Sequence, residues 1–281
     1  MRRNKTNIEP LYLVFSFLGG LVLLFLVAPL VGMVLNSSGH ELAQAGTDSE
    51  VQRSIWLTLW TSMAATLVLA IAGVPFAYLL ARKEFPLKTL VMAIVNLPIV
   101  IPHSAAGIAL LGFVSRGSFI GAAGEKIGIQ FVGGAGGIMV AMAFVSVPFL
   151  ITSARDGFAM VPERLEKAAM TLGASPARVF FTVSLPLAWR AVLSGLILMW
   201  ARGLSEFGAI AVVAYHPIVT PVLIYERFGA FGLKYARPVA VIFLAVCLIF
   251  FVAFRWVAAG IGASTSVSTQ RARAGDIHAA R

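Results

Sequence analysis

Residues Leu11–Leu35 read LYLVFSFLGGLVLLFLVAPLVGMVL and carry no charged side chain. Three further stretches also lack Asp, Glu, Lys and Arg, namely those between Arg53 and Arg82, between Lys88 and Arg116, and between Lys126 and Arg155. Each stretch exceeds the roughly 20 apolar residues that a helix needs to cross about 30 Å of hydrocarbon. A helix satisfies its own backbone hydrogen bonds where no water can reach them. The sequence therefore predicts an all-α protein that crosses a lipid bilayer several times.

The composition of the whole chain agrees with this prediction. Hydrophobic residues make up 59% of the 281 residues and charged residues 12%, whereas a soluble domain carries about 25% charged residues. Too few polar side chains are available to cover a water-facing surface, which excludes an ordinary soluble protein. We predict about six spans, at residues 11–35, 55–81, 89–114, 137–153, 191–215 and 238–254.

These spans divide the chain into three parts. Residues 1–53 hold an N-terminal cytoplasmic segment, the first span and an external loop, and residues 54–256 form the transmembrane core. Residues 257–281 form a cytoplasmic tail, which is rich in Ser, Ala and Arg from Ser264 onward. Such a composition predicts disorder in the tail.

The basic residues indicate how the chain is oriented in the membrane. Fifteen of the 22 Lys and Arg residues lie at the termini or in the loops after the second and fourth spans. Positive charge accumulates on the cytoplasmic side of membrane proteins, so we expect both termini in the cytoplasm. The net charge of +10 therefore reports orientation in the cytoplasmic membrane and not a nucleic-acid partner.

The cytoplasmic loop at residues 155–190 is long and amphipathic. Pro162 suits a helix start, and Glu163 and Glu166 favour the positive end of the helix dipole. Apolar residues follow at helical spacing, and Gly173 is a plausible helix stop. The segment is suited either to lie on the membrane surface or to dock on a soluble partner.

Two short motifs in this loop resemble those of a known family. AAMTLG at residues 168–173 and VSLP at residues 183–186 are spaced as in the permease subunits of ATP-binding-cassette (ABC) importers. Lys167 occupies the place of the family's glutamate, with Glu166 just before it. The resemblance implies a type-I ABC importer permease fold and a coupling helix at about residues 162–177, which seats in a groove of the ATPase subunit. The residues implied in this coupling are Glu166, Lys167, Ala168, Ala169, Leu172, Gly173, Ser175 and Pro176.

Three further stretches resemble the molybdate/tungstate permeases of this superfamily. They are NLPIVIPH at residues 96–103, WARGLSEFGA at residues 200–209 and PVLIYERF at residues 221–228. The resemblance covers roughly residues 50–255 and implies uptake of a tetrahedral oxyanion, most simply tungstate or molybdate, from an extracytoplasmic binding protein. Sulfate permeases share parts of these motifs, so sulfate or thiosulfate is the alternative substrate.

The chain contains no phosphate-binding sequence Gly-x-x-x-x-Gly-Lys-Ser/Thr, so it has no conventional nucleotide site of its own. ATP and its Mg²⁺ then belong to a separate ATPase subunit, and we predict neither catalytic residues, a metal site nor a bound cofactor in this chain. The family resemblance implies a homodimer with two ATPase subunits. The alternative from another class is a transporter driven by an ion gradient.

Two charges are predicted inside the fifth span. Arg202 and Glu206 are four residues apart and therefore on one helix face. An isolated charge in hydrocarbon costs about 2.5–3.5 kcal/mol on insertion scales, so they must pair or face a wet cavity. One interpretation is a structural ion pair. The other interpretation places Arg202, Ser205 and Glu206 on the path of a dianion. The negative charge of Glu206 then weakens the binding of the dianion by Arg202.

The third predicted span contains two prolines and a histidine. Pro98 and Pro102 interrupt the hydrogen bonds of a helix, so they fix a kink or form a hinge beside the gate of a transport path. His103 follows directly, and we expect it either to form hydrogen bonds within the helix or to line the same path.

Overall fold

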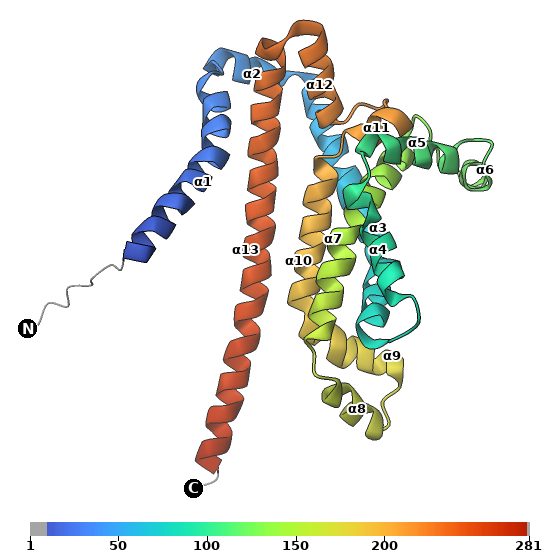
Figure 1. The fold of residues 1–281 in the computed structure, drawn as a ribbon, viewed down its shortest axis with the longest axis vertical. Coiled ribbons are helices and arrows are strands. Elements are labelled where there is room, and N and C mark those ends of the chain that lie inside the picture. The colour runs from blue at the N-terminus through green and yellow to red at the C-terminus, as the bar shows by residue number, and fades with distance from the viewer. Residues whose placement is uncertain (1–9, 280–281) are drawn as a thin grey trace, which may run out of the picture.

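The computed structural model describes residues 10–279, with side chains for residues 11–256. All regular secondary structure in this part of the chain is helical, as predicted. The elements in chain order are α1 (Pro10–Leu35), α2 (Gly39–Thr47), α3 (Ser49–Arg82), α4 (Lys88–Val100), α5 (His103–Val114), α6 (Phe119–Lys126), α7 (Ala135–Ala159), α8 (Glu163–Thr171), α9 (Pro176–Val179), the π-helical turn η1 (Phe180–Ser184), α10 (Leu185–Leu204), α11 (Gly208–Val213), α12 (Thr220–Phe231) and α13 (Leu233–Ala279) (Figure 1).

Five segments are long and apolar enough to cross a membrane by themselves. They are Leu11–Leu35, Ser49–Arg82, Ala135–Ala159, Pro176–Leu204 and Leu233–Trp256. Taken together, α4 and α5 are also long and apolar enough to cross a membrane, although the two helices are bent by 113° at their junction. The predicted number of about six spans is therefore confirmed when the bent pair counts as one crossing.

The predicted third span, residues 89–114, is interrupted, as its prolines indicate. α4 ends at Val100, and Ile101 takes an extended conformation with φ −69° and ψ 135°. The residue before a proline avoids the helical region, and Pro102 has no N–H to continue the hydrogen-bond ladder. Pro98 lies inside α4 without ending it, so the break belongs to Pro102 alone.

The fifth predicted span, residues 191–215, needs correction. α10 ends at Leu204, and three residues connect it to the short helix α11. The side chain of Glu206 accepts a hydrogen bond from the backbone N–H of Ala209 at 2.9 Å, which favours a new helix start over continuation of the old helix. Arg202 and Glu206 are therefore not on one helix, although their side chains still meet.

Segments outside the spans also contain helix. α2 lies between α1 and α3 and begins with a capping box, in which Ser38 and Glu41 each bond the other's backbone. α6 lies in the glycine-rich segment after α5.

The tail was expected to be disordered from Ser264, but α13 continues as helix to Ala279. This stretch contains no proline and several Ala and Arg residues, which are good helix formers. Residues 1–9 and 280–281, and the side chains beyond Trp256, lie outside the described part.

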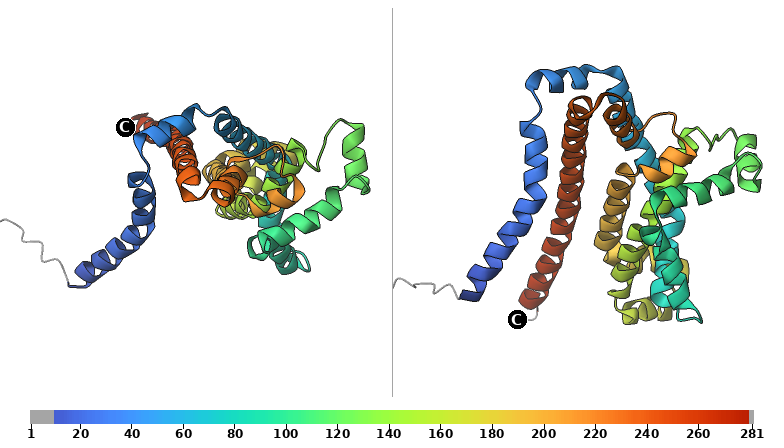
Figure 2. Two further views of the ribbon diagram at one scale, coloured as in Figure 1. Left: turned by 90° about the horizontal axis from the view of Figure 1, so that it is seen from above. Right: turned by 45° about the horizontal axis from the view of Figure 1, so that its top comes forward.

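The core bundle consists of α3, α7 and α10, which run side by side (Figure 2). Small residues let α7 and α10 approach each other closely. A Cβ atom added to Gly157 in α7 would lie only 2.3 Å from the Cβ of Ala191 in α10. Close approach of this kind is a main source of helix association in membranes, where burial of apolar surface gives little gain.

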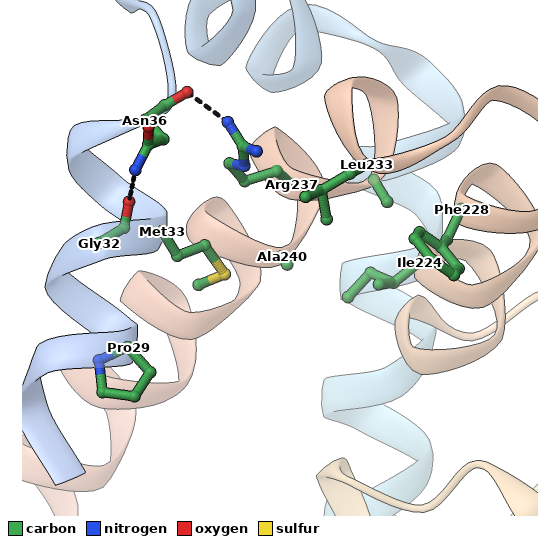
Figure 3. A pocket seen from close by; sticks show the side chains of 10 residues that line it. Pro29, Gly32, Met33, Asn36, Ile224, Phe228, Leu233, Arg237 and Ala240 are labelled. Atoms are coloured by element: carbon green, nitrogen blue, oxygen red, sulfur yellow. Dashed lines mark hydrogen bonds between the residues drawn. The ribbon is translucent and has the colours of Figure 1, made fainter. Parts of the chain in front are cut away.

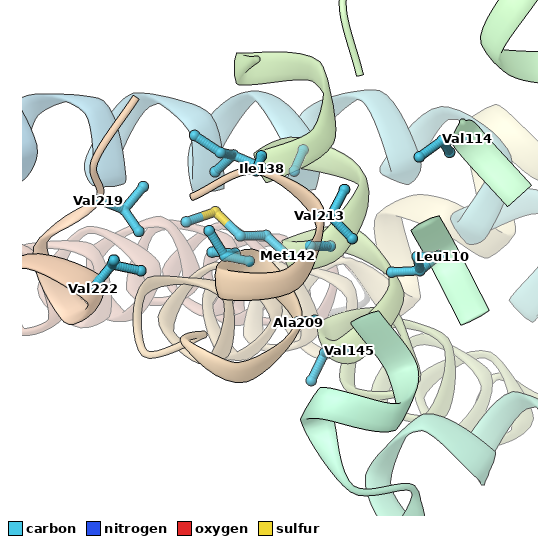
Figure 4. Packing of buried hydrophobic residues seen from close by; sticks show 13 residues of the cluster. Leu110, Val114, Ile138, Met142, Val145, Ala209, Val213, Val219 and Val222 are labelled. Carbon is cyan, nitrogen blue, oxygen red and sulfur yellow. The ribbon is translucent and has the colours of Figure 1, made fainter. Parts of the chain in front are cut away.

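Buried apolar side chains form two clusters along this bundle. The outer cluster joins α3, α5, α7, α11 and α12 and includes Leu110, Met142, Val213 and Val222 (Figure 4). The inner cluster joins α3, α7 and α10 and includes Leu80, Phe158 and Met199. The two clusters therefore share α3 and α7, and α10 contributes only to the second.

Buried hydroxyl groups also join the helices. Thr58 of α3 accepts a hydrogen bond from the backbone N–H of Thr220 at 2.9 Å, which fixes the start of α12. Further along α3, the hydroxyl of Ser62 donates to the backbone carbonyl of Trp200 at 2.8 Å. α3 is thus hydrogen-bonded to α12 and to the outer end of α10.

α1 lies apart from the core bundle, beside α13 (Figures 1 and 2). None of its described side chains is buried. A groove of about 360 Å³ separates α1 from α12 and α13, and Pro29, Met33, Phe228 and Ala240 are among the residues that line it (Figure 3). At its outer end Arg237 donates a hydrogen bond to the carbonyl of Asn36.

Candidate functional site

The loop between α7 and α10 folds as two short helices and a π-helical turn rather than as one helix over residues 162–177. Pro162 caps α8, which begins at Glu163. The helix stops where predicted, because Gly173 has φ +89°, a conformation that costs other L-residues energy. Ser175 then caps α9 by accepting a hydrogen bond from the N–H of Arg178 at 3.3 Å.

Most of the residues implied in coupling are exposed in this chain. Leu172 is 89% exposed, and Met160, just after the end of α7, is 84% exposed. Lys167, which stands in the place of the family's glutamate, pairs with Glu163 at 2.9 Å on the outside of α8. Ala169 is half-buried, and Ala168, Gly173, Ser175 and Pro176 are exposed.

Glu166 differs from the other residues of this set because it points into the protein. Glu166 is only 5% exposed. Arg82, the last residue of α3, binds it from two nitrogen atoms, with Nη2 2.7 Å from Oε1 and Nε 2.9 Å from Oε2. The hydroxyl of Ser184 in η1 donates to Oε1 at 2.7 Å, and the hydroxyl of Tyr78 donates to Oε2 at 3.4 Å. We call these four residues the tether.

The electrostatics of the tether favour the ionised carboxylate. Burial acts to raise the pKa of Glu166, but the hydrogen bonds from Arg82 and Ser184 outweigh it and hold that pKa below its ordinary value of 4.5. Nearby, the ring of Tyr78 packs edge-on against Phe158 and Phe180, with ring centroids 5.2 and 5.0 Å apart.

Sequence reasoning identified Glu166 but missed its three partners. In the sequence, Arg82 is one of the basic residues that indicate orientation, and nothing around Tyr78 predicts a contact with Glu166. Ser184 lies within the VSLP motif at residues 183–186, so the motif itself contained a hint that this position has a specific neighbour.

The other candidate residues meet at the break between α4 and α5. His103 begins α5, while Arg202 lies in the last turn of α10. Nη2 of Arg202 lies 3.0 Å from Nε2 of His103 and 3.1 Å from Oε2 of Glu206. Nη1 of Arg202 also donates to the hydroxyl of Ser205 at 3.1 Å. We call His103, Arg202, Ser205 and Glu206 the charge cluster.

The members of the charge cluster differ in their contact with the surroundings. Glu206 is 1% exposed, whereas the side chain of Arg202 is 23% exposed and that of His103 is 42% exposed. A carboxylate therefore lies beneath a guanidinium and an imidazole that are partly open. Such an arrangement presents positive charge outward and compensates part of it from within.

Two neighbouring residues make this arrangement possible. A Cβ atom on Gly208 would lie 2.7 Å from the Cβ of His103, so only glycine allows α5 to approach this close. Pro102 precedes His103 and is exposed, while Pro98 is buried in α4, one turn earlier. The structure thus brings five of the six predicted path residues together and leaves Pro98 in a helix interior.

Comparisons with known proteins identify the family of this chain. Residues 73–262 match the family described as binding-protein-dependent transport system inner membrane component. The chain is 42% identical over 258 residues to the molybdate/tungstate transport system permease protein WtpB of Thermococcus kodakarensis, covering 91% of this chain and 97% of that protein. It is 31% identical to the sulfate transport system permease protein CysT of a Synechocystis species, covering 81% of this chain and 82% of that protein.

Among solved structures, the chain resembles a bacterial alginate ABC transporter in complex with an alginate pentasaccharide-bound periplasmic protein. The TM-score is 0.69 at 17% identity, and the match covers 92% of this chain and 98% of that chain. This likeness shows the fold. The family match covers more than half of the sequence and the predicted ABC permease resemblance is confirmed, so the chain belongs to the binding-protein-dependent transport system inner membrane components and has the type-I ABC importer permease fold.

Proposed function

We propose that this chain is the permease subunit of an ATP-driven importer that carries tungstate or molybdate across the cytoplasmic membrane. The observation that carries the proposal is the 42% identity, over 91% of the chain, to a permease named for molybdate and tungstate. The relative named for sulfate is 31% identical, which makes sulfate or thiosulfate the second candidate.

The working complex contains two copies of this chain, two copies of a separate ATPase subunit that holds ATP and Mg²⁺, and an extracytoplasmic binding protein. The absence of a phosphate-binding motif in the sequence supports a separate ATPase. The resemblance to a transporter described together with a periplasmic protein supports delivery from outside. Both termini and the loop that carries α8 then face the cytoplasm, in agreement with the distribution of Lys and Arg.

α8 and the residues around it form the surface that receives the ATPase. Leu172 and Met160 expose large apolar side chains at this end of the molecule, which is characteristic of a surface that a partner covers. Arg164 and Arg178 are exposed in the same segment and add positive charge, while Lys167 is paired with Glu163. An apolar groove with an acidic rim on the ATPase complements this surface.

The charge cluster is the point at which the dianion contacts the transport path. Arg202 and His103 are partly open, and α5 begins at His103 without a side-chain cap on its first N–H groups. Helix N-termini in broken membrane helices offer such groups to anionic substrates. Buried Glu206 offsets part of the positive charge, so the cluster attracts an oxyanion without holding it too tightly for release.

Transport into proteoliposomes tests this proposal. The complete complex is reconstituted with its binding protein, and uptake of tungstate, molybdate and sulfate is measured with and without ATP inside the vesicles. We expect ATP-dependent uptake of tungstate or molybdate and little uptake of sulfate. Equal or greater uptake of sulfate would overturn the assigned substrate.

The chain alone, reconstituted without the ATPase, provides the control for the other class of transporter. We expect it to import no anion when an ion gradient is imposed across the vesicle membrane. Gradient-driven uptake by the chain alone would replace the proposed function with a secondary transporter.

A further inference from the structure

We propose that Glu166 is a positioning residue that makes α8, α3 and α10 move as one body, rather than a residue that contacts the ATPase. This inference rests on the proposed function, in which α8 receives the movement of the ATPase. Glu166 determines whether that movement reaches the helices that cross the membrane.

Burial of Glu166 excludes it from the docking surface. The residue is 5% exposed and its neighbours Lys167 and Ala168 are exposed on the other side of the same helix. A partner that binds the exposed side of α8 does not reach the carboxylate without breaking its bonds to Arg82 and Ser184. Glu166 therefore connects α8 inward.

The tether joins three separate elements through one carboxylate. Arg82 ends α3, Ser184 ends η1 and leads directly into α10, and Glu166 lies in the middle of α8. Nη2 of Arg82 also donates to the backbone carbonyl of Val161 at 3.0 Å, which ties the residue just before α8 to α3. Because the carboxylate and guanidinium are both largely buried, separating them leaves uncompensated charge inside the protein.

Both helices held by Glu166 lead to the charge cluster. α10 has 20 residues and carries Arg202 in its last turn, about 26 Å from its start at the usual helical rise. α3 is bonded to the same end of α10, because Ser62 donates to the carbonyl of Trp200, two residues before Arg202. α3 and α10 are thus joined by Glu166 at one end of both helices, and by Ser62 between the middle of α3 and the other end of α10.

Because α3 and α10 are joined at two points, the pair transmits a displacement of α8 better than either helix would alone. η1 lies at its inner corner, and π-helical turns often occur at functional sites where a helix changes its winding. The bond from Ser184 to Glu166 fixes this turn relative to α8. Displacement of α8 by the ATPase then moves the start of α10, and with it Arg202.

The test uses Glu166→Gln in the complete complex, reconstituted in proteoliposomes with the binding protein and tungstate. ATP hydrolysis and tungstate uptake are measured in the same sample. We expect the ATPase to remain bound, because the docking side of α8 is unchanged, and the ATP hydrolysed per anion imported to rise by about tenfold, within the usual range of coupling between sites. A residue that only stabilised the fold would lower both activities together and leave this ratio unchanged.

Glu84→Gln is the matched control. Glu84 is also a glutamate at the cytoplasmic end of the bundle and also forms an ion pair, with Lys88 at 2.7 Å, but its side chain is exposed. We expect wild-type uptake and a wild-type ratio for this variant. A rise equal to that of Glu166→Gln would overturn the inference, because loss of any nearby carboxylate would then suffice.

Ser184→Ala removes a single bond of the tether and keeps the Arg82–Glu166 pair intact. We expect a smaller rise of the same ratio, and this variant decides the question if Glu166→Gln does not assemble. A wild-type ratio in the assembled Glu166→Gln complex, or in Ser184→Ala if only that variant assembles, would overturn the inference and leave the proposed function standing. ATP-independent uptake by the wild type would instead remove the proposed function itself.

Discussion

The carboxylate of Glu206 lies 3.3 Å from the ring nitrogen Nδ1 of His103. The two residues come from different spans, and the break after α4 together with the end of α10 brings them side by side. Two interrupted helices therefore build one polar site inside an apolar bundle.

Arg202→Gln removes the charge that faces outward in this site. We expect uptake of tungstate per assembled complex to fall by at least about tenfold, because a hydrogen bond to a charged group is worth about 1.5–3 kcal/mol. ATP-driven uptake in vesicles, normalised to the amount of assembled complex, measures the effect.

Arg227→Gln is the control for loss of a largely buried, ion-paired arginine elsewhere. Arg227 bridges Asp48 and Glu50 at 2.6 and 2.8 Å at the outer end of the molecule. We expect wild-type uptake per complex in this variant. Unchanged uptake in assembled Arg202→Gln would remove Arg202 from the transport path.

Gly208→Ala tests the close contact that positions His103. The added Cβ would lie 2.7 Å from the Cβ of His103, so α5 or α11 must shift, at a cost of about 1–3 kcal/mol for overpacking. We expect a lower thermal unfolding midpoint of the purified chain in detergent and reduced uptake. Gly112→Ala in α5 meets no atom within 4 Å and serves as the control, for which an equal loss would argue against the contact.

Two substitutions of Gly173 distinguish an effect on docking of the ATPase from an effect on folding of the loop. A Cβ there meets no atom within 4 Å in this chain, but the backbone has φ +89°. Asn tolerates positive φ better than other side chains, so Gly173→Asn should retain the ATPase, whereas Gly173→Trp should lose it because the indole occupies the docking side. Co-purification of the ATPase with each variant gives the answer. Equal binding by both would argue against docking at this residue.

The tether also predicts how stability depends on pH. Because the pKa of Glu166 lies below its ordinary value of 4.5 in the folded chain, its stabilising contribution is complete above about pH 4.5 and is lost as the pH falls through the lowered pKa. We expect the difference in unfolding midpoint between wild type and Glu166→Gln to be largest near neutral pH and to shrink in acid. A difference that stays constant down to about pH 3 would show that the ionised carboxylate is not the stabilising species.

The apolar stretches and the loop motif were sufficient to predict the fold class, the number of spans and the stop at Gly173. These features are local, since length, charge and glycine conformation act over a few residues. Pro102 predicted a kink in the third span, but the size of the bend depends on how α5 packs against α11 at Gly208. The end of α10 at Leu204 was missed because apolar residues continue on both sides of it.

The inward direction of Glu166 could not be predicted from its neighbourhood in the sequence. A glutamate in the first turns of an amphipathic helix is ordinarily solvated and favourable there for its charge alone. Its burial depends on Arg82 and Ser184, which reach it from other helices. Long-range contacts of this kind leave no periodic signal, and the motif around Ser184 indicates only that the position matters.

The separation of α1 from the bundle affects how the chain adapts to its membrane. α1 has 26 residues and is therefore about 39 Å long, compared with about 30 Å of hydrocarbon. A helix longer than the bilayer is thick accommodates the excess by tilting, and α1 can change its inclination without disturbing a single buried side chain of the core. A change in membrane thickness should thus be accommodated by α1 at the periphery of the molecule, while the distance between α8 and the charge cluster stays constant.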